Sequence, residues 1–166
     1  MTAVRPALVS DLPALTDIYN HYVVHTPITF DVDPSTTEER RGWFDDHAET
    51  GRYRLLVADE HGDVVGYAST SRWRPKAAYG TTVESSVYVR HDAVRRGIGR
   101  ALYDALFDAI AHEDVHTIVA GIALPNDASV ALHERVGFRQ VGVFRDVGRK
   151  FGRFWDVAWF QRRLDE

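Results

Sequence analysis

The sequence contains no cysteine, and this absence removes several classes of function at once. A chain without thiols has no disulfide framework, no thiolate metal site and no cysteine nucleophile, so an enzyme of this sequence must use other groups. The N-terminus also lacks a basic segment followed by an apolar one, and no apolar run approaches the length of a membrane span. These absences predict a cytoplasmic protein that binds no membrane.

A strong charge of one sign is also missing. The net charge is −4 and charged residues make up 27% of the chain, with no long run of either sign, so binding to nucleic acid is disfavoured. The small basic cluster of Arg95, Arg96 and Arg100 suits a single phosphorylated small molecule instead. With 45% hydrophobic residues, the chain 1–166 is expected to form one domain around one core.

Metal-ligand patterns are sparse, although the chain has eight histidines. His21 and His25 have the spacing that places two ligands on one helix face, but the eight histidines are mostly scattered, so this pair is interpreted as structural. We therefore expect no metal in the functional site.

Hydrophobic periodicity predicts the elements of the first half. Apolar residues at helical spacing follow an extended segment at 3–9, so a helix is expected with Ser10 as its N-cap. Thr36 and Glu39 form a capping-box pattern that predicts a second helix, ended near Gly51. Three β-rich runs follow, the first two joined as a hairpin, at 53–59, 64–71 and 81–89.

The second half alternates strand and helix. The strongest helical pattern covers 97–113, where apolar residues recur three and four positions apart. A nearly continuous apolar run at 117–124 predicts a strand covered on both faces, and Asn126 or Asp127 then caps a helix ended by Gly137.

Two final strands are expected at 141–147 and 155–164, on either side of a turn at 148–153. The complete order is an antiparallel meander followed by strand, helix, strand, helix and strand. It predicts an α/β fold with a mixed central sheet of about seven strands and helices on both faces. Ligands in such sheets bind where a strand end meets a helix N-terminus, which here is the segment 89–99.

That segment lies within VYVRHDAVRRGIGRALY, residues 87–103, where a strand, a polar turn, two glycines and a helix start follow one another. Backbone N–H groups converge there at the positive end of the helix dipole, and Gly97 and Gly99 permit close approach of an anion. Taken alone, the loop is explained equally well as a helix start with a solvated basic face. The P-loop pattern GxxxxGK and the dinucleotide pattern GxGxxG are both missing from the sequence, which argues against an NTP or NAD site.

The RRGIG loop, together with ALPNDASVALHERVGF one strand later, resembles the GCN5-related N-acetyltransferase (GNAT) superfamily. The phosphinothricin and methionine sulfoximine N-acetyltransferase branch is closer still. Its features cover nearly the whole chain and include IYNHYV, ITFD, AYGTTVESSVYV, LPNDASV, LHERVGF and GRKFGRFWDV. The resemblance implies the GNAT-type acyl-CoA N-acyltransferase fold and acetyl-CoA as co-substrate.

The same resemblance implies which residues hold acetyl-CoA. The pantetheine arm is expected to pair with the backbone of one strand as an added strand, and the pyrophosphate is expected at the glycine loop. The residues are Val87, Tyr88, Val89, Val94, Arg95, Arg96, Gly97, Ile98, Gly99, Arg100, Asn126 and Ser129. Two positions depart from the family pattern: Val94 stands where the loop usually has Gln or Arg, and Phe154 where this branch usually has Trp.

Amide formation from a thioester needs a neutral amine, donors around the carbonyl oxygen and a proton for the thiolate. Glu84 interrupts an otherwise apolar or small strand, a pattern that alone favours a solvent-facing residue; the resemblance makes it the leading candidate for the base, directly or through a water. Period two places Glu84, Ser86 and Tyr88 on one face and Ser85 on the other. In the branch that the chain resembles, a Glu at this position contacts the acceptor amine.

His133 is the second catalytic candidate, since Asn126, Ser129 and His133 fall on one helix face. Many acetyltransferases of the superfamily have Tyr here, whereas the branch that the chain resembles has His. An acid, a base and a buried structural histidine are equally compatible with the pattern.

Basic residues next to Trp73 suit a zwitterionic acceptor, since cations would hold its acidic group while Glu84 faces its amine. By resemblance, Arg74 and Lys76 are the substrate-binding pair. The full predicted acceptor set is Trp73, Arg74, Lys76, Val83, Glu84 and Ser85.

The sequence thus predicts an N-acetyltransferase that moves the acetyl group of acetyl-CoA onto a small amino acid of the phosphinothricin, methionine sulfoximine or methionine sulfone type. Direct attack in a ternary complex is expected, because no covalent nucleophile is needed. Two alternatives stay open: a GNAT acting on another amine, such as an antibiotic, a polyamine or a protein N-terminus, and a non-catalytic acyl-CoA-binding sensor. The resemblance also implies a homodimer.

Overall fold

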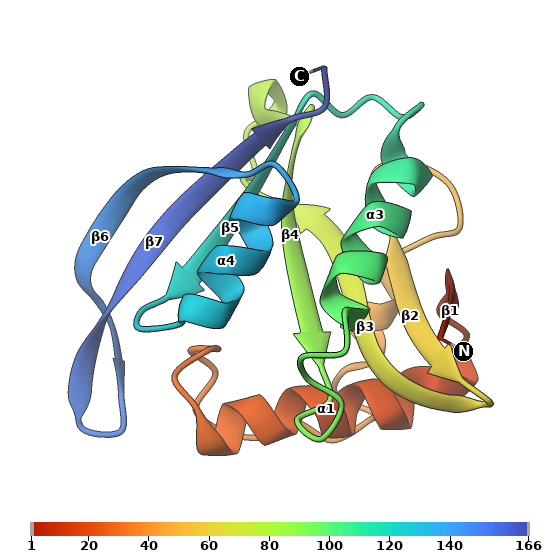
Figure 1. Cartoon of the computed structure of the whole chain (residues 1–166), viewed down its shortest axis with the longest axis horizontal. Helices are drawn as coiled ribbons and strands as arrows, with labels where there is room; N and C mark the ends of the chain where they lie inside the picture. The colour runs from red at the N-terminus through yellow and green to blue at the C-terminus, as the bar shows by residue number, and fades with distance from the viewer. Residues whose placement is uncertain (1, 166) are drawn as a thin grey trace.

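The structure is a computed structural model that describes residues 2–165, and its centre is one seven-stranded sheet (Figure 1). In chain order its strands are β1 Ala3–Pro6, β2 Leu55–Glu60, β3 Asp63–Arg72, β4 Thr82–Val89, β5 Thr117–Ala123, β6 Arg139–Lys150 and β7 Arg153–Arg163. The α-helices are α1 Leu12–His25, α2 Arg41–Asp45, α3 Ile98–Ile110 and α4 Asp127–Arg135.

The strand order is β1-β2-β3-β4-β5-β7-β6. Neighbouring strands run antiparallel except for β4 and β5, which are parallel. The predicted mixed α/β sheet of seven strands with an antiparallel start is therefore confirmed.

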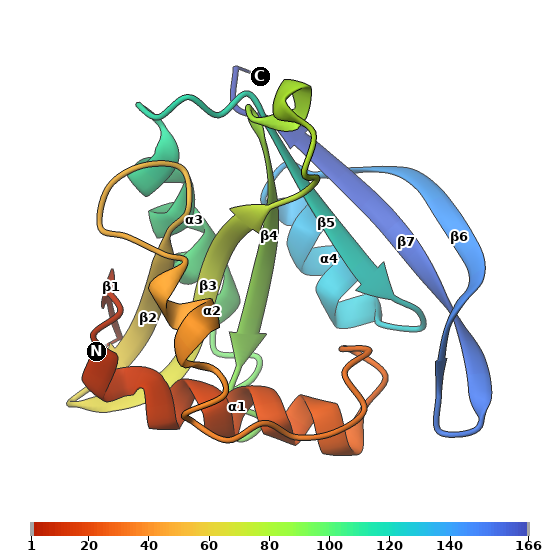
Figure 2. The same ribbon diagram turned by 180° about the vertical axis from the view of Figure 1, so that it is seen from behind.

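The two faces of the sheet carry different helices (Figures 1 and 2). Leu102 and Leu106 of α3 have no exposed surface and pack with Val83 on one face, which α4 also covers. Leu15 and Ile18 of α1 pack on the opposite face, together with α2. The two long helices, α1 and α3, are thus held by the apolar stripes that their sequence periodicity indicates.

The parallel pair β4–β5 is short. Three register pairs join them, Thr82 with Thr117, Val83 with Ile118 and Glu84 with Val119, and beyond Glu84 the strands separate. Figure 1 shows β4 and β5 close at one end and far apart at the other. This separation positions the functional site.

Two expectations about the first helices were wrong in detail. Ser10 does not cap α1; it lies in a short 3-10 turn, and the neighbouring Asp11 accepts the Leu8 N–H at 2.7 Å. The Thr36–Glu39 capping box does form, with the Thr36 N–H donating to Glu39 at 2.7 Å. The helix after it is nevertheless short and ends at Asp45, because the chain then turns so that the Ala48 N–H can bond the Tyr53 carbonyl at 3.0 Å.

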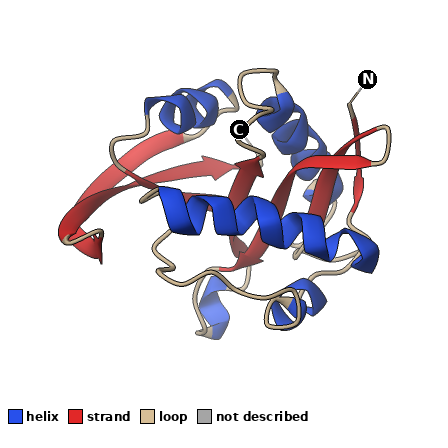
Figure 3. Ribbon diagram, turned by 90° about the horizontal axis from the view of Figure 1, so that it is seen from below, coloured by secondary structure: helices blue, strands red, loops and turns tan. Residues whose placement is uncertain are grey.

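The last two strands are longer than expected and form a hairpin that reaches beyond the layered part of the molecule (Figure 3). The residues predicted as a turn at 148–153 lie mostly within strands, and only Phe151 and Gly152 make the turn, both with positive φ. Between residues 2 and 165, no helix has the length and apolar character needed to cross a bilayer.

Candidate active site

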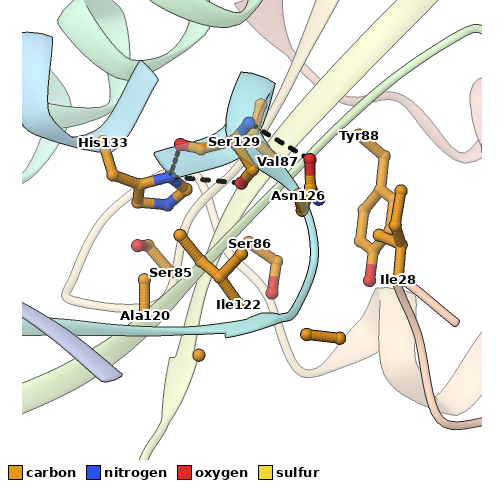
Figure 4. A pocket seen from close by; sticks show the side chains of 12 residues that line it. Ile28, Ser85, Ser86, Val87, Tyr88, Ala120, Ile122, Asn126, Ser129 and His133 are labelled. Atoms are coloured by element: carbon orange, nitrogen blue, oxygen red, sulfur yellow. Dashed lines mark hydrogen bonds between the residues drawn. The ribbon is translucent and has the colours of Figure 1, made fainter. Parts of the chain in front are cut away.

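The separation of β4 from β5 opens a cleft between them, which α4 borders on one side (Figure 4). The cleft includes side chains from both faces of β4 because it passes through the sheet where pairing has ended. Its lining residues are Ile28, Ser85, Ser86, Val87, Tyr88, Ala120, Gly121, Ile122, Ala123, Asn126, Ser129 and His133.

The backbone of β4 turns polar groups toward this cleft. The Arg90 N–H bonds the Val65 carbonyl at 2.8 Å, on the β3 side, so the N–H and C=O groups of Val87 and Val89 point the other way, toward β5. The Val89 carbonyl accepts a bond from the Tyr22 hydroxyl of α1. Val87 therefore presents an N–H and a C=O to the cleft at the point where β5 has left, which is the arrangement that an added strand requires.

Glu84 occupies the last position at which β4 still pairs with β5. Its side chain shares a face with Ser86 and Tyr88, as period two predicts, and is half-buried. Within the described chain no hydrogen bond or ion pair reaches its carboxylate, and burial raises the pKa of Glu84 above its usual value, while the positive charge of Arg74 opposes that rise. A partly desolvated carboxylate without a partner is suited to accept a proton.

The predicted acceptor residues separate into two groups. Trp73, Arg74 and Lys76 follow the end of β3, whose Ser71 pairs with Glu84, and the Arg74 guanidinium lies 5.2 Å from the centre of the Trp73 ring. Arg74 and Lys76 are exposed.

Val83 and Ser85, which also belong to the predicted acceptor set, point to the α3 side of β4, opposite Glu84. Val83 has no exposed surface and belongs to the core under α3, whereas Ser85 lines the cleft. Of the predicted acceptor set, Val83 is the residue that the structure keeps away from any ligand.

The predicted pyrophosphate loop runs from Val94 into the first turn of α3. Arg95 and Gly97 both have left-handed backbone conformations, with φ of 64° and 79°. The first helical hydrogen bond is from the Ala101 N–H to the Gly97 carbonyl at 3.1 Å, so the N–H groups of Ile98 to Arg100 precede it and are available at the positive end of the helix.

The three arginines of this loop differ in their availability. Arg96 forms an ion pair with Glu60 at 2.8 Å, and Arg100 forms one with Asp104 at 2.9 Å. Arg95 has no ion-pair partner among the described residues. All three arginines are exposed, and the two surface ion pairs are weak enough for a phosphate to replace the carboxylate.

The two loop glycines have different physical roles. Gly97 has open space around it, and its positive φ is what favours glycine. Gly99 has an ordinary φ, but a Cβ there would lie 2.9 Å from Cδ2 of Leu132 in α4. The second glycine therefore permits the contact between α3 and α4 rather than an unusual backbone conformation.

The start of α4 is built as predicted. Asn126 is the N-cap, and its Oδ1 accepts the Ser129 N–H at 3.2 Å (Figure 4). Its amide nitrogen has no partner among the described residues, and both Asn126 and Ser129 line the cleft. The cap thus leaves a donor available for a ligand.

His133 has 4% exposed surface and both of its ring nitrogens are hydrogen-bonded. Nδ1 lies 2.7 Å from the Ser129 carbonyl and Nε2 lies 2.8 Å from the Tyr103 hydroxyl. Burial lowers the pKa of His133, and the hydrogen bond to Ser129 opposes this shift. The histidine borders the cleft through its ring, but neither nitrogen is free to contact a ligand.

Sequence reasoning did not identify Tyr22 or Tyr103. Tyr103 lies on the buried stripe of α3, between Leu102 and Leu106, where a hydroxyl requires a partner. The hydroxyl group of a tyrosine on an apolar helix stripe was the sequence feature that could have identified Tyr103. Tyr22 gave no comparable signal, because its contact depends on how α1 crosses the end of β4.

The rings of His21 and His25 lie beside one another, with centroids 4.9 Å apart. The His21 ring stacks on His91 with centroids 4.0 Å apart, and burial lowers the pKa of His21. Across residues 2–165, no group of three or more His, Asp or Glu side chains is arranged to hold a metal ion.

The contrast between Gly97 and Gly99 can be tested by unfolding in urea. Gly97→Ala should cost about 1–2 kcal/mol of stability through its left-handed conformation, and Gly99→Ala should cost a similar amount through its clash with Leu132. Adding Leu132→Ala should relieve the second loss by about 0.5–3 kcal/mol relative to additivity. Leu132→Ala should leave the stability loss of Gly97→Ala unchanged. If Leu132→Ala relieved both losses equally, the two glycines would not have the different roles described above.

Known proteins share both the sequence and the fold. Residues 4–159 match the family described as acetyltransferase (GNAT) domain. The chain is 58% identical over 163 residues to a phosphinothricin N-acetyltransferase of Streptomyces coelicolor, with 97% of this chain and 95% of that protein covered. It is 40% identical over 163 residues to an L-methionine sulfoximine/L-methionine sulfone acetyltransferase of Pseudomonas aeruginosa, with 98% and 95% covered.

A solved structure agrees with these matches. The phosphinothricin acetyltransferase of Sinorhizobium meliloti, in complex with acetyl-CoA, superimposes with a TM-score of 0.91 at 34% identity, covering 98% of this chain and 88% of that one. The predicted GNAT-type fold and the resemblance to the phosphinothricin and methionine sulfoximine branch are confirmed. The chain belongs to the acetyltransferase (GNAT) family.

Proposed function

We propose that this protein transfers the acetyl group of acetyl-CoA to the primary amine of a small amino acid of the phosphinothricin, methionine sulfoximine or methionine sulfone type. One observation carries the proposal: β4 presents backbone donors and acceptors to the cleft, and the partnerless, half-buried carboxylate of Glu84 belongs to the last β4–β5 pair before the strands separate. The relatives named for these acceptors, at 58% and 40% identity, support the acceptor class.

The chain's own groups fit acetyl-CoA in two places. Val87 would pair with the pantetheine arm through its N–H and C=O. A backbone N–H of β4 that points into the cleft would suit the thioester oxygen as negative charge develops on it. The N–H groups at the start of α3, with Arg95 beside them, suit the pyrophosphate. The side chain of Val94 adds no polar contact, so the backbone must supply the binding there.

The acceptor would be held on the other side of Glu84. Arg74 and Lys76 would bind its carboxylate or phosphinate, while Glu84 would take a proton from its ammonium group; the charge of Arg74 acting on Glu84 supports this arrangement. No covalent enzyme intermediate is required, because the amine attacks the thioester directly. The role of Phe154 is not explained by its position on the exposed end of the hairpin.

We also propose that the 166 residues act as one domain, that the protein works as a cytoplasmic homodimer, and that it requires no metal. Five large apolar side chains on the β6–β7 hairpin are more than half exposed and would be covered by a second copy. They are Val141, Phe144, Val147, Phe151 and Phe154.

The dimer can be tested by analytical ultracentrifugation over a range of concentrations. The protein should sediment as a dimer, and Phe144→Asp should shift it to monomer, since a carboxylate would be buried in the interface. A wild-type monomer at all concentrations would refute this part of the proposal.

The activity is tested by thiol release from acetyl-CoA with a panel of L-methionine sulfone, L-methionine sulfoximine, phosphinothricin, polyamines and aminoglycosides. Turnover should be confined to the three amino acids, and Glu84→Gln should lower kcat about 10²- to 10⁴-fold. Glu38→Gln, which removes an exposed carboxylate elsewhere, is the control and should retain activity. Turnover on another amine would show that the proposed acceptor class is wrong. Acetyl-CoA binding with no turnover on any amine would favour a non-catalytic sensor.

The pH dependence tests the charge environment of Glu84. A base must be ionised, so kcat/KM should fall as the pH drops through the pKa of Glu84, which burial places above the ordinary value of about 4.3. Arg74→Gln removes the charge that opposes this rise and should move the acidic limb to higher pH. The control variant Arg41→Gln, which changes an exposed arginine of α2, should leave the acidic limb unchanged. An acidic limb that stays fixed or moves to lower pH in the Arg74→Gln variant would contradict the role of Glu84 as the base.

A further inference from the structure

A buried chain of hydrogen bonds joins the cleft to His133 and is not used by the mechanism above. The Ser85 hydroxyl lies 3.2 Å from the Tyr103 hydroxyl, which lies 2.8 Å from Nε2 of His133. Nδ1 of the same ring lies 2.7 Å from the Ser129 carbonyl. Four residues from β4, α3 and α4 are thus connected end to end.

The Ser129 carbonyl fixes the direction of these hydrogen bonds. A backbone carbonyl can only accept, so Nδ1 of His133 carries the hydrogen. In the neutral ring Nε2 is then an acceptor, and the Tyr103 hydroxyl must donate to it. The Tyr103 oxygen in turn accepts from Ser85, so every donor in the chain points away from the cleft.

The apolar surroundings favour the neutral forms of His133 and Tyr103 in the resting protein. His133 is packed against the rings of Phe138 and Phe160 as well as Tyr103. Burial lowers the pKa of His133 and raises the pKa of Tyr103 well above its usual range, and no charged group contributes to either shift. The titratable group facing His133 from α3 is Tyr103, and β4 contributes only the Ser85 hydroxyl.

The chain meets the cleft at Ser85. His133 also borders the cleft, but both of its nitrogens are engaged by Ser129 and Tyr103, so it cannot exchange a proton with a ligand directly. When Ser85 takes up a proton, Nε2 gains one through two transfers along existing hydrogen bonds, from Ser85 to Tyr103 and from Tyr103 to the imidazole. Among the three side chains Ser85, Tyr103 and His133, the imidazole is the one basic site, because the hydroxyl groups do not hold an extra proton near neutrality.

We propose that Ser85, Tyr103 and His133 form a proton relay that carries a proton from the attacking amine to the departing sulfur, which rests on the proposed acetyltransferase function. As the C–N bond forms, the nitrogen gives a proton to Ser85, Ser85 gives its own to Tyr103, and Tyr103 gives its own to Nε2 of His133. As the C–S bond breaks, the transfers reverse and Ser85 protonates the thiolate. One N–H bond is lost, one S–H bond is gained, and the three side chains return to their starting state.

In this scheme Ser85 is the group that contacts the reacting atoms, and Tyr103 and His133 act through it. Glu84 removes the first proton of the ammonium group from the opposite face of β4, so the two proton paths do not overlap. The Ser129 carbonyl sets the tautomer of His133, and Tyr103 connects the unprotonated Nε2 to Ser85.

The relay is tested with Tyr103→Phe and Ser85→Ala, measured for kcat and for the KM of acetyl-CoA. Each variant should lower kcat about 10- to 100-fold, a part of what general acid–base catalysis contributes, while KM changes less than about twofold. Tyr67→Phe is the matched control, since Tyr67 is equally buried on the other face of the sheet, and it should keep its kcat. Wild-type kcat in a folded Tyr103→Phe variant would overturn the relay.

Nitrogen-15 NMR of the histidines gives a readout that needs no turnover. In the wild type, His133 should carry its hydrogen on Nδ1 and show a hydrogen-bonded, unprotonated Nε2, and Tyr103→Phe should change the Nε2 signal. Hydrogen on Nε2 in the neutral wild-type protein would overturn the relay even if Tyr103→Phe fails to fold. An inactive wild type with the expected tautomer would instead refute the proposed function.

Discussion

The structure depends on the point at which β4 stops pairing with β5. Three register pairs hold the strands together, and the pairing ends at Glu84. From there, backbone groups of β4 that a continuous sheet would bury in hydrogen bonds face a cleft instead. The strands are kept apart by what is packed around them: α1 crosses the end of β4 and bonds Val89 through Tyr22, while α4 follows β5 on the other side.

The alternation of side chains along β4 divides the chemistry between two environments. Glu84 faces the α1 side, where burial without a partner raises its pKa and makes it a better base. Ser85 faces the α3 side, where it begins a neutral hydrogen-bonded chain to His133. In the proposed mechanism, Glu84 and Ser85 therefore serve two separate proton paths on opposite faces of β4. The same period of two buries Val83 in the core, although it neighbours both functional positions.

Much of the fold could be predicted from local patterns. The apolar stripe at 97–113 and the continuous apolar run at 117–124 gave α3 and β5, and Asn126 was recognised as a cap because its role depends on residues three positions away. Long-range contacts were not predictable: the short α2 results from a turn back to Tyr53, and the ion pair of Arg96 with Glu60 joins distant segments. For the same reason the unusual setting of Glu84 among small and apolar neighbours was visible in the sequence, although its role came from the family resemblance, whereas the engagement of both His133 nitrogens could not be predicted.

The most direct test of this account is a crystal structure of the protein with a thioether analogue of acetyl-CoA and L-methionine sulfone. The pantetheine arm should lie in the gap between β4 and β5 and bond the Val87 N–H and C=O, with the pyrophosphate at the first turn of α3. The acceptor amine should lie within hydrogen-bond reach of Glu84. An analogue bound outside the gap, or an acceptor on the far side of the sheet from Glu84, would contradict the account.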